Sequence, residues 1–97
     1  MANFDLAAFI RALAQITSDL KTLGYIDPHD KICIYKHNQT SHEKDSLEIT
    51  INFTSEITSF EAFIISEVLK SALNECDIIG ESNDLRQVSI QFRPLSE

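Results

Sequence analysis

The chain is organised around residues 58–84, which read TSFEAFIISEVLKSALNECDIIGESND and contain its longest apolar run. The stretch opens on a capping-box pattern, in which Thr58 and Glu61 each satisfy a free backbone amide at the start of a helix. At 100° per residue, one broad face of this helix is apolar and is predicted to lie in the core; it comprises Ile65, Val68, Leu69, Ala72, Leu73 and Cys76. We therefore predict a helix from Ser59 to Asn74 or Cys76, followed by a loop that reaches to the last strand.

An amphipathic helix is also predicted for residues 4–23. Its apolar residues recur at alternating spacings of three and four, which places them on one stripe: Leu6, Phe9, Leu13, Ile16, Leu20 and Leu23. Asn3 is the predicted N-cap, Asp5 suits the positive end of the helix dipole, and Gly24 can end the helix in the left-handed region. The stripe also fits a heptad repeat, so two arrangements stay open: packing on the protein's own sheet, or pairing with a second copy.

Three strands are predicted from the pattern of apolar residues. Residues 32–35 are apolar on both faces, which is typical of a strand in the middle of a sheet. Residues 47–53 and 88–92 alternate apolar and polar side chains, which indicates half-buried strands, and Pro94 follows the second of these. The polar residues between the first two strands predict a long hairpin loop.

These elements predict a single α+β domain over residues 1–97. The order is helix, strand, strand, helix, strand, which we expect to form a two-layer sandwich with both helices on one sheet face. The hairpin makes the first two strands antiparallel, and a right-handed crossover through the second helix would leave the third strand parallel to the second. With the doubly apolar strand in the centre, we predict a three-stranded mixed sheet of order 2-1-3.

The charge is strongly acidic and unevenly placed. Fifteen acidic residues against eight basic ones give a net charge of -7. Residues 54–85 hold seven of the acids and one base, Lys70, and so carry -6 of that charge. This balance disfavours direct binding to nucleic acid or to an anionic membrane. It favours a basic protein partner, or serves only to keep the protein in solution.

The candidate partner-binding residues lie in the same region. Phe63 falls among polar residues on the outer face of the second helix, with Phe60 close by, as expected of an interface anchor. The alternative is that the first helix or residues 54–57 cover both rings. Five acids would steer a basic partner and exclude wrong ones: Glu67, Glu75, Asp77, Glu81 and Asp84.

The polar sheet face is another candidate surface. Its predicted residues are Glu48, Thr50, Asn52, Gln87, Ser89, Gln91 and Arg93. Nucleic-acid-binding sheets need stacking aromatics and flanking bases, whereas this face offers Tyr35, few bases and a repelling Glu48. We therefore expect no direct nucleic-acid contact.

No catalytic, cofactor or metal motif is recognisable. Glycine-rich phosphate loops and nucleophile elbows are absent from the sequence, and His29, His37 and His42 have no zinc-type spacing to Cys33 or Cys76. We expect no cofactor, reduced cysteines, no signal peptide and no membrane span, and hence a cytoplasmic protein. An enzyme that uses Cys33 with a loop histidine is the least favoured hypothesis.

These observations favour a small non-catalytic protein that binds a basic protein. Its size, acidity and lack of cofactor motifs suit an inhibitor, immunity or anti-defence factor of bacterial or phage type. The competing hypothesis is a structural homodimer that pairs through the Phe60 and Phe63 side or through an exposed sheet edge.

Overall fold

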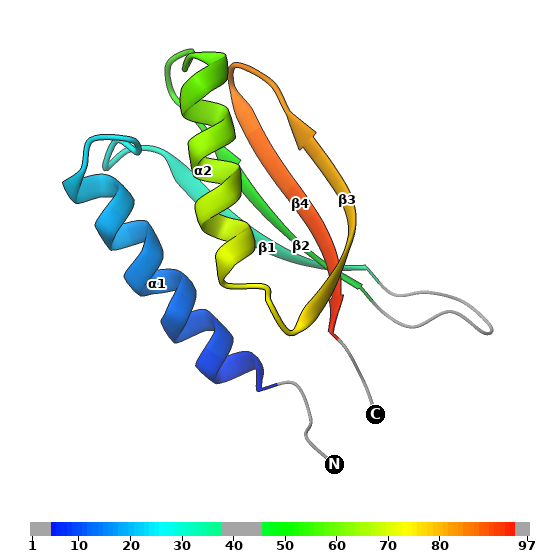
Figure 1. Ribbon diagram of the computed structural model, residues 1–97. Helices are drawn as coiled ribbons and strands as arrows, with labels where there is room; N and C mark the ends of the chain where they lie inside the picture. The colour runs from blue at the N-terminus through cyan, green and yellow to red at the C-terminus, as the bar shows by residue number, and fades with distance from the viewer. Residues whose placement is uncertain (1–4, 38–45, 95–97) are drawn as a thin grey trace.

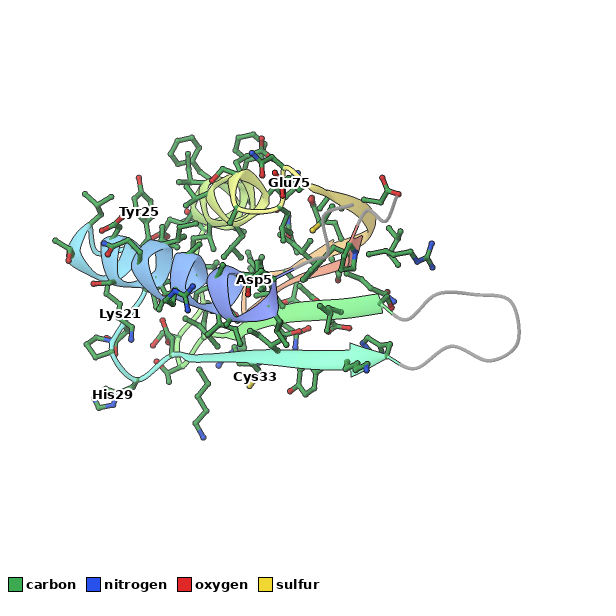
Figure 2. The ribbon with its side chains drawn as sticks, turned by 90° about the horizontal axis from the view of Figure 1, so that it is seen from below. Asp5, Lys21, Tyr25, His29, Cys33 and Glu75 are labelled. Carbon is green, nitrogen blue, oxygen red and sulfur yellow. The ribbon has the colours of Figure 1, made fainter. Side chains whose placement is uncertain are left out.

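The computed structural model describes residues 5–37 and 46–94, which form two helices and a four-stranded sheet (Figure 1). The elements, in chain order, are α1 (Leu6–Thr22), β1 (Lys31–His37), β2 (Ser46–Asn52), α2 (Ser59–Ser71), β3 (Cys76–Asn83) and β4 (Gln87–Pro94). Both helices lie on the same face of the sheet (Figures 1 and 2), so the predicted α+β class and its two layers are confirmed.

The predicted antiparallel pairing of the first two strands is confirmed, whereas the predicted strand number, strand order and parallel direction of the last strand are wrong. The observed order is β1-β2-β4-β3, and every neighbouring pair is antiparallel. β2 and β4 form the centre, where Ile49 lies opposite Ile90 and Ile51 opposite Val88. The prediction failed because it treated residues 76–83 as a loop. One further strand reverses the chain once more, so β4 returns antiparallel to β2.

The physical reason for the missed strand is its irregular pattern. β3 pairs with β4 through a register shift between Ile78 and Gly80, so one extra residue breaks the alternation of side chains. It is also an edge strand with Asp77 and Glu81 at exposed positions. Charges and bulges are common on edges, and they hide the period of two that identifies a strand.

β1 lies at the opposite edge, although its sequence predicts a central strand. Ile32 and Ile34 pack against the core, whereas Cys33 and Tyr35 belong to the face that turns away from the helices. Figure 2 shows the Cys33 side chain on that side of β1. The second apolar face of β1 therefore consists of the partly exposed Cys33 and Tyr35, and no further layer of the structure covers it in the described residues.

The helix ends follow from local chemistry. Asp5 is the N-cap of α1 and accepts a hydrogen bond from the Ala8 amide at 3.1 Å, whereas the predicted cap, Asn3, lies outside the described residues. Gly24 has a φ of 85°, which confirms its predicted role after the helix. Thr58 and Glu61 form the predicted capping box of α2.

The core lies between the sheet and the two helices. Phe9 of α1 packs against Phe92 of β4 with ring centroids 5.3 Å apart, so α1 packs on its own sheet. Of the predicted stripe, Leu6 and Leu23 at the two ends are exposed. The fully buried centre comprises Ile49, Ile51, Ile65, Leu69, Val88, Ile90 and Phe92.

Candidate functional site

The outer face of α2 exposes two aromatic rings. Phe60 is 67% and Phe63 56% exposed, although each lies in the first turns of a well-capped helix. More than half of each ring is therefore open to solvent. Residues three apart on a helix lie on the same side, so the two rings form one apolar surface. Burying such rings against a partner would stabilise the complex by about 25 cal/mol for each Å² of apolar surface removed from water.

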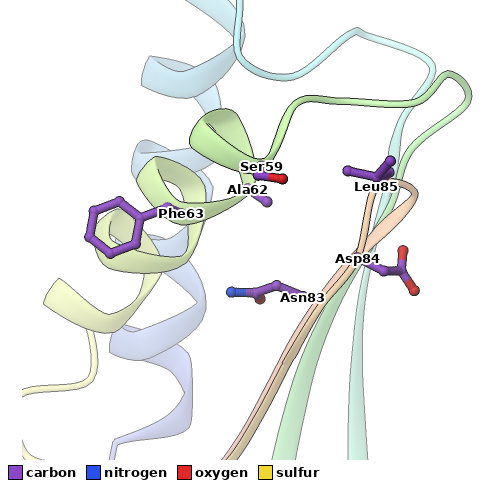
Figure 3. Close-up of a pocket in the computed structure, with 6 residues that line it drawn as sticks. All are labelled: Ser59, Ala62, Phe63, Asn83, Asp84 and Leu85. Carbon is purple, nitrogen blue, oxygen red and sulfur yellow. The ribbon is translucent and has the colours of Figure 1, made fainter.

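A shallow hollow adjoins this surface, between the start of α2 and the β3–β4 turn (Figure 3). It has a volume of about 130 Å³ and is lined by Ser59, Ala62, Phe63, Asn83, Asp84 and Leu85. Leu85, on the other side of the hollow, is 44% exposed. In Figure 3 the Asn83 side chain points toward α2, whereas the Asp84 carboxylate points away from it. Asp84 accepts a hydrogen bond from the Arg86 amide at 2.7 Å, which stabilises the turn.

We call the outer face of α2, from Phe60 to Lys70, together with β3 the α2–β3 side of the molecule. Its middle carries an ion-pair cluster of three residues. The Lys70 Nζ atom lies 2.7 Å from Glu67 and 2.8 Å from Glu81, and so joins α2 to β3. The hydrogen bonds to Glu67 and Glu81 raise the pKa of Lys70, and Lys70 lowers the pKa of Glu81. Two of the five predicted steering acids therefore share one cation.

Ser66 shows what the missed strand changed on this side. Its helical position predicts the outer, polar face, yet it is 1% exposed. α2 contacts β3 along this flank, and Ser66 is among the groups that lower the pKa of Glu81 on that strand. The side of α2 that carries Ser66, which its helical position predicts to be exposed, is thus covered by β3.

Two other predicted acids, Glu75 and Asp77, lie where α2 leads into β3, at the other end from the hollow beside Phe63. Glu75 lines a separate hollow of about 240 Å³ with Asp5, Phe9 and Cys76. Burial, and after it the charges of Glu75 and Asp77, raise the pKa of the Cys76 thiol. The predicted acids are therefore not one patch: Glu75 lies at one end, Glu67 and Glu81 share Lys70, and Asp84 lines the hollow with Phe63.

The opposite face of the sheet is polar, and its side chains bond to one another. Glu48 accepts hydrogen bonds from Thr50 at 2.6 Å and Ser89 at 2.9 Å, and its other oxygen lies 2.9 Å from His37 Nε2. The Thr50 bond is the largest cause of a lowered pKa of Glu48. Two further cross-strand bonds join Gln87 to Asn52 and Gln91 to Ser46. This closed network leaves few free donors or acceptors at its centre for a ligand.

The arrangement of Glu48 differs from that of a catalytic triad. A nucleophilic serine needs an imidazole as its base, with the carboxylate on the far side of that ring. Here the carboxylate of Glu48 lies between Ser89 and His37. Within the described ranges 5–37 and 46–94, no group of three histidine, cysteine, aspartate or glutamate residues could hold a metal ion. His42, one of the three histidines of the sequence, lies outside those ranges.

Sequence reasoning missed Asn83 and Leu85, which line the same hollow as Phe63, and the exposed Ile78 and Ile79 of β3. The signal that could have found them is the run of turn-forming residues Ser82–Asp84 directly before an alternating strand, which is typical of a hairpin. Recognising that hairpin would have placed its turn beside the start of α2.

Comparisons with protein-family models, with curated proteins and with solved structures find no match to this chain. Among the described residues, no helix has the length and apolar character needed to cross a membrane.

Proposed function

We propose that this protein is a non-catalytic domain that binds a basic protein through the α2–β3 side. The observation that supports it most is the exposure of Phe60 and Phe63, 67% and 56%, on one side of α2. Large aromatic side chains are the residues that most often dominate binding energy at interfaces. Here they would anchor the partner, and the hollow beside Phe63 would receive one of its side chains.

The acids give this surface its preference for a basic partner. Glu67, Glu81 and Asp84 lie on the same side of the molecule as the rings, and Lys70 offsets part of their charge. Charges around an apolar anchor mainly raise the association rate and exclude partners of the same sign. Glu75 and Asp77 lie at the far end of this side and would act by long-range steering. An inhibitor, immunity or anti-defence factor of bacterial or phage type fits this proposal.

A second copy of the chain is the competing partner. Exposed rings on one helix face can pair across a two-fold axis, as the homodimer hypothesis requires. The net charge of -7 works against it, because two copies repel each other. Light scattering over a concentration series separates the two: a stable dimer that Phe63→Asp dissociates favours the second copy.

The decisive experiment compares two exposed apolar positions in capture assays with proteins from the native host. Phe63→Asp should abolish capture of a basic protein, whereas Leu23→Asp, at a 70% exposed position at the end of α1, should leave it unchanged. Loss of an anchor costs about 2 kcal/mol or more, which is roughly a thirtyfold loss of affinity. Capture should also weaken at high salt. Equal capture by both variants contradicts the proposal.

A further inference from the structure

The outer edge of β3 has no partner strand. β3 is the last strand of the sheet and pairs with β4 on one side. In the described part of the chain, no strand pairs with its other side. Most of its residues are exposed, including Ile78 and Ile79 at 40% and 42%. An open edge presents backbone donors and acceptors to any extended chain that approaches it.

The hairpin geometry identifies which backbone groups point outward. The Asp84 amide donates to the Gln87 carbonyl at 2.9 Å, so these two residues form a hydrogen-bonded pair. Hydrogen-bonded and non-hydrogen-bonded pairs alternate along an antiparallel ladder. In this register, Asn83–Val88 and Glu81–Ile90 are the non-hydrogen-bonded pairs. The amides and carbonyls of Asn83 and Glu81 therefore face away from β4.

Only part of this edge is regular enough to pair. The register shift between Ile78 and Gly80 bends the first half of β3, and bulges discourage further pairing. From Gly80 to Asn83 the register with β4 is continuous. The regular half is also the one beside Phe63, because Asn83 and Phe63 line the same hollow.

The charges around this edge select the kind of chain that fits. Residues 75–84 contain four acids and no base. The other open edge, β1, carries Lys31 and Lys36 and no acid. Because two copies with a net charge of -7 repel, a foreign basic segment matches the β3 edge better than a second copy does.

We infer that the outer edge of β3, over Gly80–Asn83, binds an extended basic segment of the partner by strand addition. The inference rests on the proposed function and specifies how the partner binds. The backbone of the segment pairs with Glu81 and Asn83. Its side chains on the helix side lie beside Phe63 and Leu85, which favours apolar residues there, and its lysine or arginine residues face the acids.

A synthetic peptide tests this directly. The probe is a nine-residue peptide of alternating lysine and valine with blocked ends, and NMR follows hydrogen exchange of the β3 amides. The Glu81 and Asn83 amides should exchange at least about tenfold more slowly when the peptide binds. Ser82 is the internal control, because the register makes Ser82 and Ser89 a hydrogen-bonded pair and its amide faces β4. The same peptide N-methylated at alternate residues should lose about tenfold or more in affinity, because it cannot pair along that edge.

A pair of variants separates backbone pairing from side-chain contact. Asn83→Pro removes an outward amide and keeps both rings and every acid, whereas Asn83→Ala keeps the amide and removes the side chain. The proline variant should lose about tenfold in peptide affinity, and the alanine variant less than about threefold. If Asn83→Pro does not fold, as circular dichroism would show, the exchange measurement on the unchanged protein decides alone.

Each other outcome overturns the inference. Absence of peptide binding at millimolar concentration, equal binding of the N-methylated peptide, or equal losses in the two Asn83 variants would exclude strand addition. Protection of Glu81 and Asn83 that rises with protein concentration in the absence of peptide would assign the edge to a second copy. If Phe63→Asp abolishes partner capture while Asn83→Pro does not, the proposed function holds and strand addition is wrong.

Discussion

The sheet face away from the helices and the α2–β3 side differ in whether their exposed groups already have bonding partners. On the face away from the helices, Glu48, Thr50 and Ser89 bond to one another across β2 and β4. On the α2–β3 side, Phe60 and Phe63 are open to solvent, and no strand among residues 5–37 and 46–94 pairs with the outer edge of β3. Polar groups that bond to one another stabilise the fold, whereas exposed rings and an open strand edge are features at which other chains bind.

This difference separates stability from recognition in one molecule. Changes on the polar face should alter the free energy of unfolding and leave partner binding intact. Changes on the α2–β3 side should do the reverse. Four measurements test that separation.

Two phenylalanines give the largest contrast. Phe92→Ala should lower the free energy of unfolding by about 3–5 kcal/mol, because the fully buried ring leaves a cavity between α1 and β4. Phe63→Ala should change it by about 0.5 kcal/mol or less, because that ring is 56% exposed. Urea denaturation measures both. Similar losses would mean that Phe63 belongs to the core.

The polar network should give the next largest effect. Glu48→Gln removes the charge that Thr50 and Ser89 bond to, and should cost about 1–2 kcal/mol of unfolding free energy in urea denaturation. Glu56→Gln is the matched control at an exposed position, with an expected change near zero. Capture of the partner should be unchanged in both variants. Loss of capture in Glu48→Gln would place the polar face in the interface.

The same carboxylate predicts a pH dependence with a defined sign. Its hydrogen bonds with Thr50, Ser89 and His37 lower the pKa of Glu48 from 4.5. A group whose pKa is lower in the folded state contributes stability above its unfolded pKa and loses that contribution as pH falls through the folded pKa. The stability difference between the natural protein and Glu48→Gln should therefore be constant near pH 7 and shrink below about 4.5. A difference that persists at lower pH would contradict this assignment.

The ion-pair cluster should give the smallest effect. Lys70→Gln breaks the contacts with Glu67 and Glu81, but exposed ion pairs contribute about 1 kcal/mol or less. The variant should bind a basic partner about twofold faster at low salt, because two acids lose their shared cation. Lys21→Gln on α1 is the control with the same change in net charge. Stopped-flow association rates for the two variants should differ; equal rates would count against local steering by these acids.

Much of the fold follows from local sequence patterns. The capping box at Thr58, the glycine at position 24 and the alternation around Ile49 and Ile90 each act through neighbours in the chain, so residue order alone identified them. β3 has no such pattern, since its bulge and its acids interrupt the alternation. The central position predicted for β1 failed because strand order depends on contacts between distant segments.

Some features of the candidate site were likewise recognisable in the sequence, and others were not. The out-of-phase position of Phe63 on its helix was visible in the sequence, and so were the acids of residues 75–84. That Leu85 and Asn83 line one hollow with Phe63, that Lys70 joins Glu67 to Glu81, and that Glu75 lies apart became visible only in the structure.

Local patterns of residues identify the two helices, three of the four strands, the α+β class and the acidity of one third of the chain. The tertiary structure decided the fourth strand, the antiparallel order β1-β2-β4-β3 and the open edge beside the exposed rings. The reason is physical: helix caps and amphipathic periods are set by residues within a few positions of one another. The pairing of strands depends on the hydrogen bonds and burial that become available when segments far apart in the chain meet.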